Sequence, residues 1–218
     1  PHRGLNVITN GLEIAYLLTQ NPDSTVLLTG GQMHAQSGAL DGVLNGALAM
    51  ALYYNGQYDR CIRVAEDVLP LARRQQLYNT VRSVLNSLVN WCIATGKDER
   101  AEVHIREMHE LAAISSDEDL TALAHMLQGK LLGMRGEHVE ALKHYDEAES
   151  LVALFKSFTW RPELLAMKAW ALVDQRMLGE ARPLLMKAAP LARASGSREW
   201  VGYVQIVQAR FDLLEGDA

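Results

Sequence analysis

A repeat of 40 residues constrains the fold of this chain more than any other feature of its sequence. Glycine recurs at this spacing, and an arginine fills the one phase without glycine: Gly56, Gly96, Gly136, Arg176 and Gly216. Three further columns keep the same register, one of small residues, one of leucine and one apolar: Cys61, Ala101, Ala141, Ala181; Leu71, Leu111, Leu151, Leu191; Leu44, Val84, Ala124, Leu164, Val204. Self-similarity at a fixed period of this length is the signature of a solenoid.

Within each repeat the apolar residues have helical spacing. Over residues 136–151 they recur every one to three positions, at Val139, Ala141, Leu142, Tyr145, Ala148 and Leu151. Extended to the other repeats, the pattern predicts helices over residues 44–55, 59–72, 81–95, 99–114, 120–135, 139–154, 162–175, 178–194 and 198–215. We therefore expect residues 43–218 to form a mostly α, right-handed solenoid of about 4.5 helix pairs.

Local signals at the helix ends support these boundaries. Ser115, Ser116 and Asp117 can cap the helix that follows them, and Pro162 suits the first turn of the next helix but one. The run at residues 195–197, Ser-Gly-Ser, is suited to closing one helix and capping the next.

The repeats resemble the tetratricopeptide (TPR) class. The carriers are Gly129 and the Ala-x3-Tyr-x2-Ala run of Ala141, Tyr145 and Ala148. Because the period is 40 rather than the TPR value of 34, the repeats are also similar to the longer helical arrays of bacterial MalT and LuxR-related regulators. This resemblance implies a non-enzymatic protein-interaction and sensing module, part of a bacterial transcription regulator.

Residues 1–42 do not follow the repeat. Two β-rich runs at 5–9 and 25–29 flank a predicted helix at 12–20, with an Asn-Pro turn before the second run. Strand, helix and strand in this order predict a small β-α-β, Rossmann-like unit and a domain boundary after residue 42.

This N-terminal segment resembles part of the sugar-phosphate-sensing domain of DeoR-type repressors. The carriers are V-I-T-N at 7–10, the Asn-Pro turn, L-L-T-G-G at 27–31 and S-G-A-L at 37–40. The resemblance implies binding of a phosphorylated sugar by Thr9, Asn10, Gly30 and Gly31, with the phosphate at a helix N-terminus. The family's upstream D-S-G-T-T loop has no counterpart here. A remnant, or one half of a fusion, is the alternative interpretation.

The composition of the chain limits the classes of function that we expect for it. The net charge of −5 and the pI of about 5.8 give no basic footprint for nucleic acid. No apolar run approaches the roughly 18 residues that span a membrane, and no signal peptide opens the chain, so we expect a cytoplasmic protein. Cys61 and Cys92 fall on apolar faces and are expected to be reduced. The missing initial methionine suggests an excised piece of a longer protein.

The sequence offers little for catalysis, and we expect no enzyme, no cofactor and no metal. His104 and His109 are five residues apart and His138 and His144 six apart, so neither pair shares a helix face; we expect solvated side chains. An isomerase-like enzyme of the N-terminal sheet class is a distant alternative.

Binding in the groove of the solenoid is the favoured function. Curvature makes the first helix of each pair line the concave face, and positions one after and three before the small column supply the groove residues Asn86, Asn90, Met126, Lys130, Trp170 and Arg210. The amides and cations suit a peptide carboxylate or acidic side chain, and Trp170 and Met126 suit an apolar anchor. An ordinary solvated groove is the alternative. We also expect a homodimer through the exposed last helix.

Overall fold

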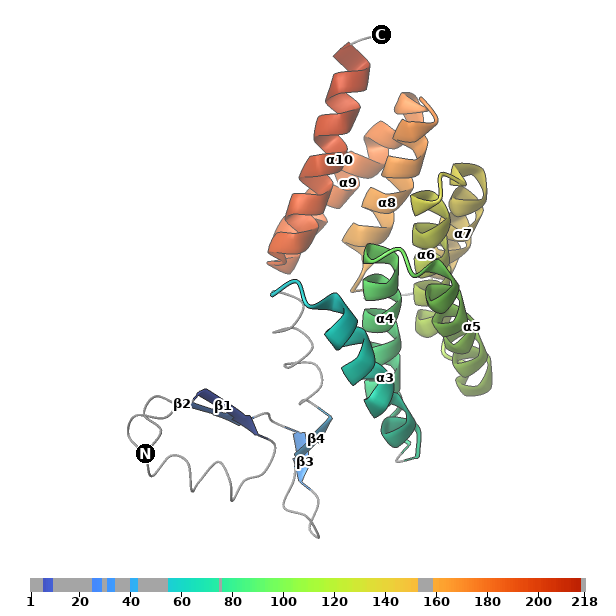
Figure 1. Cartoon of the computed structure of the whole chain (residues 1–218). Coiled ribbons are helices and arrows are strands. Elements are labelled where there is room, and N and C mark those ends of the chain that lie inside the picture. The colour runs from blue at the N-terminus through green and yellow to red at the C-terminus, as the bar shows by residue number, and fades with distance from the viewer. Residues whose placement is uncertain are drawn as a thin grey trace. The chain divides into compact units, whose positions relative to one another are not determined.

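The computed structural model describes residues 6–9, 25–28, 31–33, 40–42, 55–74, 76–152 and 159–216 (Figure 1). The chain divides into two compact units, residues 1–91 and residues 92–218, and each is described by itself.

The first unit opens with two short strand pairs. Strand β1 (Asn6–Thr9) pairs in parallel with β2 (Thr25–Leu28), and β3 (Gly31–Met33) pairs antiparallel with β4 (Leu40–Gly42). Strands β1 and β2 fall where the sequence predicts them, whereas β3 and β4 are not predicted. The helix expected at 12–20 lies outside the described residues, so the β-α-β unit as a whole stays a prediction.

Two helices of the first unit follow, α3 (Tyr58–Arg74) and α4 (Tyr78–Ala94), and the boundary between the units falls inside α4. Their apolar faces are buried, with Cys61, Ile62, Leu85 and Leu88 fully inaccessible to solvent. The helix predicted at 44–55 lies almost wholly outside the described residues.

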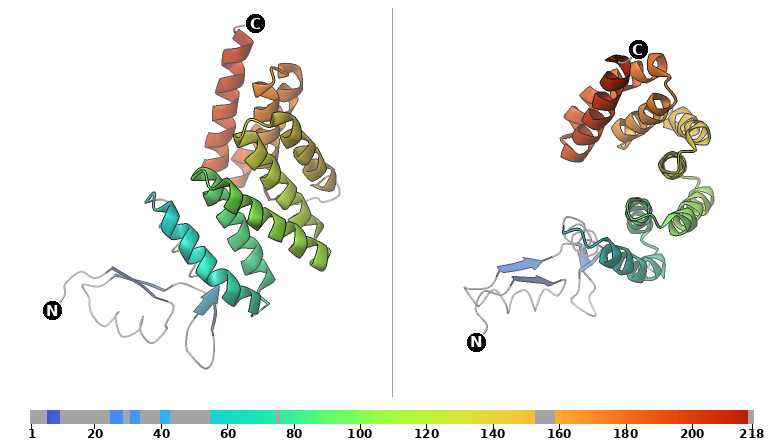
Figure 2. Two further views of the ribbon diagram at one scale, coloured as in Figure 1. Left: turned by 45° about the vertical axis from the view of Figure 1, so that its right-hand side comes forward. Right: turned by 45° about the horizontal axis from the view of Figure 1, so that its top comes forward.

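Six helices build the second unit after the end of α4. They are α5 (Asp98–Ser115), α6 (Glu118–Met134), α7 (His138–Val152), α8 (Arg161–Asp174), α9 (Leu178–Ser195) and α10 (Arg198–Gly216). Each consecutive pair packs together, and in addition α6 packs on α8 and α8 on α10. The first helices α6, α8 and α10 therefore form one layer, and α5, α7 and α9 form the other (Figure 2). This arrangement confirms a helical solenoid.

The turns explain the period. Backbone φ is positive at Gly96, Gly136 and Arg176, which follow α4, α6 and α8, and at Gln76, Ser116 and Gly196, which follow α3, α5 and α9. It is also positive at Gly56. Left-handed residues thus recur every 20 residues wherever the turns are described, and glycine adopts this conformation without steric cost. Arg176 takes the same conformation with φ of 62°, despite its side chain.

The predicted caps at Asp117, Pro162 and residues 195–197 are confirmed, whereas Ser115 and Ser116 do not cap α6: Ser115 is the last residue of α5, and Ser116 is the left-handed C-cap of that helix. The Asp117 carboxylate accepts a hydrogen bond from the backbone N–H of Leu120 at 2.9 Å, Pro162 lies in the first turn of α8, and Gly196 is the left-handed C-cap of α9. The Ser197 hydroxyl accepts from the N–H of Trp200 at 3.3 Å. These bonds satisfy groups that a helix end leaves without intrahelical partners.

The column of small residues forms the core of the repeats. Cys61, Ala101, Ala141 and Ala181 are all fully buried. The closest approach is between α6 and α7, where a Cβ on Gly129 would lie 2.5 Å from Cε1 of the buried Tyr145. Glycine at 129 therefore sets the distance between these two helices.

Candidate functional site

The six predicted groove residues are divided between the two units. Asn86 and Asn90 lie on α4 in the first unit, and both are half-buried. The Asn90 amide donates to the Asn86 backbone carbonyl at 2.9 Å and to the Asn86 side-chain oxygen at 3.1 Å. These amides bind each other, one turn apart on the same helix.

Met126 does not lie on the groove surface, which corrects the prediction. Its side chain is fully buried. The reason is that α6 packs against α5, α7 and α8 at once. These three helices cover most sides of α6, including the side that carries Met126. Met126 therefore belongs to the core and cannot serve as an apolar anchor for a partner in this conformation.

Lys130 and Glu163 form an ion pair between α6 and α8. Lys130 Nζ lies 3.0 Å from Glu163 Oε1, and the two side chains are 24% and 14% exposed. The lysine that the sequence offers to an acidic partner is thus already paired with a carboxylate of the next repeat.

Asp174, at the end of α8, organises the neighbouring part of the same layer. Its carboxylate accepts hydrogen bonds from the indole N–H of Trp170 at 2.8 Å and from Arg210 Nε of α10 at 2.7 Å. His138 Nε2, from the start of α7, lies 3.5 Å from the same carboxylate. Asp174 therefore connects three helices.

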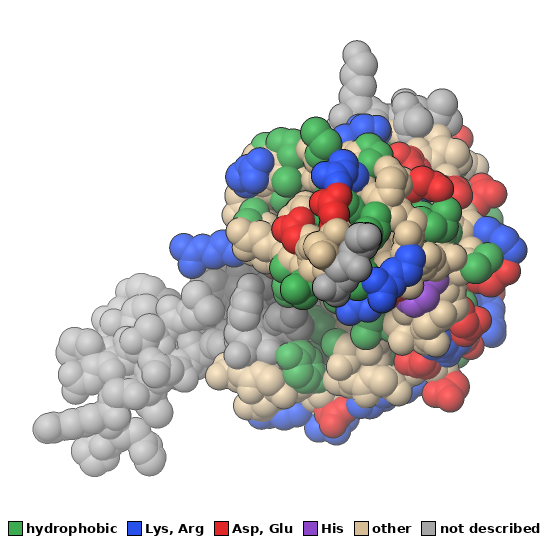
Figure 3. All heavy atoms as spheres, turned by 90° about the horizontal axis from the view of Figure 1, so that it is seen from above, with side chains coloured by type: hydrophobic (Ala, Val, Ile, Leu, Met, Phe, Trp, Pro, Cys, Tyr) green, Lys and Arg blue, Asp and Glu red, His purple; other side chains and the backbone are tan. Residues whose placement is uncertain are grey.

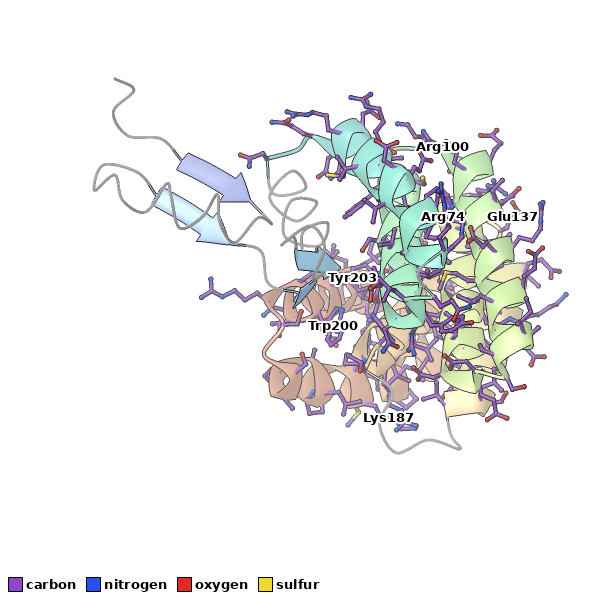
Figure 4. All side chains as sticks on the ribbon, turned by 90° about the horizontal axis from the view of Figure 1, so that it is seen from below. Arg74, Arg100, Glu137, Lys187, Trp200 and Tyr203 are labelled. Carbon is purple, nitrogen blue, oxygen red and sulfur yellow. The ribbon has the colours of Figure 1, made fainter. Side chains whose placement is uncertain are left out.

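Aromatic rings complete this arrangement. Trp170 and Tyr203 stack with centroids 6.0 Å apart and planes 15° apart, and the Arg210 guanidinium lies over the Trp170 ring at 5.6 Å. Both rings are half-buried, and Tyr203 projects from the first half of α10, close to Trp200 (Figure 4). Such rings offer a large, rigid contact area together with a polar group.

Tyr203 is influenced by the carboxylates of both ion pairs. Burial raises the pKa of Tyr203 above its usual value of 10.0, and the negative charges of Glu163 and Asp174 raise it further. Both carboxylates therefore act on the same phenol, which stays protonated at neutral pH and can donate a hydrogen bond. We call the following residues the inner-face cluster: Lys130, Glu163, Trp170, Asp174, Tyr203 and Arg210.

The charges of the inner-face cluster balance. Two cations face two carboxylates, and the bridged carboxylates are more buried than the cations that cover them. Acidic and basic side chains are likewise interspersed over the face of the molecule seen in Figure 3. The arrangement offers an aromatic surface with a balanced polar rim.

Glu163, Asp174 and Tyr203 escaped the sequence analysis, although signals for them exist. Glu163 and Tyr203 are 40 residues apart and share one phase of the repeat, and Asp174 follows Trp170 by four residues on the same helix face. The prediction considered only two positions in the first helix of each repeat. Comparing every position of these helices between repeats would have found all three residues.

A second group of polar residues corrects the expectation of solvated histidines. His104 is buried, and His109, His125 and His144 come together from α5, α6 and α7. The rings of His109 and His125 lie 4.8 Å apart, those of His125 and His144 lie 5.4 Å apart, and the last two bring their Nδ1 atoms to 3.1 Å. We call this the histidine cluster.

The described residues also bear on three other possibilities: a metal site, a membrane-spanning helix and a sugar-phosphate site. In the described part of the chain, no group of three or more His, Cys, Asp or Glu side chains could hold a metal ion. Among the same residues, no helix combines the length and apolar character that crossing a bilayer requires. Of the residues expected at a sugar phosphate, Thr9 ends β1 and Gly31 opens β3, while Asn10 and Gly30 lie outside the described residues.

No protein-family model matches this chain, and no curated protein matches it. The solved structures that share its fold include the following two. The apo form of RapI has a TM-score of 0.61 at 19% identity, over 77% of this chain and 47% of RapI. Aspartyl phosphate phosphatase F from Bacillus subtilis has a TM-score of 0.62 at 12% identity, over 80% of this chain and 49% of the phosphatase. The chain therefore spans about half the length of these proteins, and the likeness establishes a TPR-like helical-repeat fold.

Proposed function

We propose that this chain is a protein-interaction module that binds a peptide segment of a partner protein over the inner-face cluster. The observation that carries this proposal is the stacked, half-buried pair Trp170 and Tyr203 on two successive first helices. Tryptophan, tyrosine and arginine are the residues that most often dominate binding energy at protein interfaces, and here Tyr203 and Arg210 both contact Trp170.

The chemistry of the cluster shapes the expected partner. Because both cations are already bonded to carboxylates, an acidic partner must compete with Glu163 or Asp174. We therefore propose an apolar or aromatic side chain against Trp170 and Tyr203 as the main contact. Arg210, 49% exposed, is the member best placed to receive a partner's carboxylate as well.

Binding at this place would also alter the solenoid. Lys130–Glu163 joins α6 to α8, and Asp174–Arg210 joins α8 to α10. A partner that takes over one of these charges changes the packing of neighbouring repeats, and so reorients whatever is attached to them. In the first unit, we propose separately that the amides of Asn86 and Asn90 on α4 contact a partner.

The wider context belongs to the same proposal: action by binding and not by turnover, a place in a bacterial transcription regulator, and a cytoplasmic location. So does a homodimer through α10, which exposes 57% of Ile206 and 70% of Leu213.

The proposal is tested by selecting peptides from a random display library on the intact chain and measuring their affinities by titration calorimetry. We expect Trp170→Ala to weaken the selected peptides at least tenfold. Lys187→Ala is the matched control, because Lys187 is exposed on α9 in the other layer (Figure 4). Equal affinities for the parent chain and the Trp170 variant would contradict the proposal.

Sugar-phosphate sensing by the N-terminal segment is the second candidate. It is favoured by the parallel pairing of β1 with β2, since the carboxyl ends of parallel strands are where such ligands bind in open α/β sheets. Thr9 is the last residue of β1 and Asn10 comes next in the sequence, while Gly30 and Gly31 come shortly after the last residue of β2, Leu28. Hydrogen exchange with added pentose phosphates tests it: protection at these four residues, lost in Asn10→Ala, is the expected result.

A further inference from the structure

We propose that the histidine cluster is a proton-sensitive joint, which holds α5, α6 and α7 together while its three rings are uncharged and loosens when they take up protons. The proposal does not depend on the proposed function, because the cluster shares no residue with the inner-face cluster.

The geometry favours uncharged rings. The Nδ1 atoms of His125 and His144 are 3.1 Å apart, which is a hydrogen-bond distance when one nitrogen carries a hydrogen and the other does not. If both nitrogens carry hydrogens, two donors and two positive rings face each other at this distance. His109 lies edge-on against His125 with the ring planes 76° apart, so a charge on His125 also acts on a third ring.

The surroundings offer little compensation for positive charge. The charged groups that act on the rings from the packed helices are Glu147, near His125 and His144, and Glu140, near His144. Both carboxylates belong to α7 and are exposed. In contrast, α5 and α6 contribute His109 and His125 themselves, whose mutual effect is repulsion. Three charged rings would therefore exceed the available negative charge.

The direction of the effect follows from the pKa values. Burial lowers the pKa of all three histidines, and burial together with the neighbouring rings lowers the pKa of His125 from 6.5 to about 4. Since the unfolded chain then binds protons more readily than the folded one, the stabilisation is complete above the unfolded pKa of 6.5. It is lost as the pH falls from 6.5 towards 4.

The position of the histidine cluster determines which helix contacts protonation would weaken. Helix α5 is the second helix of one pair, and α6 and α7 form the next pair. The cluster therefore spans the contact between two repeats as well as the contact inside one repeat. Protonation would weaken both contacts and leave α8, α9 and α10 packed.

The test measures the folding equilibrium of the full chain by urea unfolding at pH 7.5 and at pH 5.0. We expect the equilibrium constant to fall on the order of tenfold, a value that allows for solvent screening of half-buried rings. His125→Asn should remove most of this fall. His2→Asn is the matched control, because it removes a histidine that is not a member of the cluster, and it should keep the full effect.

A second measurement does not depend on the stability of any variant. Histidine ring signals followed by NMR during an acid titration of the native chain should show His125 titrating well below pH 6.5. The same fall in His125→Asn as in the parent chain, or His125 titrating near pH 6.5, would overturn the proposal.

Discussion

The inner-face cluster and the histidine cluster lie in the same unit and both connect neighbouring helices, but they do so by opposite electrostatic means. In the inner-face cluster each described cation touches a carboxylate, as in Lys130–Glu163 and Arg210–Asp174. In the histidine cluster three groups that would carry the same charge are in contact, and they are compatible because burial keeps them neutral. The first cluster needs its charges and the second needs to be without them.

This difference separates two roles. Opposite charges beside half-buried aromatic rings can exchange one partner for another, which suits a binding surface. Neutral rings packed between helices can only gain protons, which suits a response to pH. The position of a polar group in the repeat therefore says less about its role than the sign and number of the groups around it.

The largest expected effect comes from separating α6 and α7, the two helices that carry His125 and His144. Gly129→Ala would place a methyl group within 2.5 Å of the Tyr145 ring, so the helices must move apart. We expect a loss of about 2–3 kcal/mol in the free energy of unfolding, measured with urea. Gly202→Ala is the control in α10: a Cβ there meets nothing within 4 Å, and alanine favours the helix by about 0.5–1 kcal/mol.

Removing the Asp174 carboxylate from the inner-face cluster should lower the free energy of unfolding by less than Gly129→Ala does. Asp174→Ala takes away the acceptor of the Trp170 indole and the partner of Arg210. We expect a loss of about 1–2 kcal/mol at pH 7.5 by urea unfolding, since the carboxylate is largely buried and its donors are left unbonded. The same variant should leave the acid response of the histidine cluster unchanged.

The matched control for this prediction is Asp146→Ala. Asp146 also forms an ion pair, with Lys168, but its side chain is 64% exposed. An exposed pair contributes about 0–1 kcal/mol, so this change should be the milder of the two. If both variants lose the same free energy of unfolding, the hydrogen bonds of Asp174 stabilise the chain no more than an exposed ion pair does.

The helices were predictable because their signals are local. Every described helix begins and ends within three residues of its predicted ends. Asp117, Pro162 and Gly196 mark helix ends through the backbone beside them, and the turn residues recur with the repeat. Burial of Met126 was not predictable from its own column, because it depends on three other helices closing around α6.

The two polar clusters were only partly predictable. Lys130, Trp170 and Arg210 were identified from their column, but their carboxylate partners were not, because ion pairing depends on the distance between helices. The histidine cluster has a signal in hindsight: residues almost equally distant from a turn meet in an antiparallel helix pair. His109 and His125 flank Ser116 in this way, and His125 and His144 flank Gly136.

A smaller effect is expected at the turns beside the two clusters. Arg176, which follows the inner-face residue Asp174, holds a φ of 62°, and Gly136, between the helices of His125 and His144, holds a φ of 81°. Arg176→Gly should stabilise the chain by about 0.5–1 kcal/mol, and Gly136→Ala should destabilise it by about 1 kcal/mol. Thermal unfolding of both variants checks the pair; changes of the same sign would contradict the repeated left-handed turn.

The smallest effect, and the sharpest separation of the clusters, is expected from salt. At pH 7.5 the inner-face ion pairs are charged and the histidines neutral, so raising the salt concentration should weaken the contribution of the ion pairs by a few tenths of a kcal/mol. At pH 5.0 salt should instead relieve repulsion among the histidines that have taken up protons. The measurement is the salt dependence of the urea midpoint in the parent chain, relative to Asp174→Ala at pH 7.5 and to His125→Asn at pH 5.0. Opposite signs of these two differences are expected, because salt screens attraction in one cluster and repulsion in the other. Equal signs would mean that both clusters are stabilised by the same electrostatics.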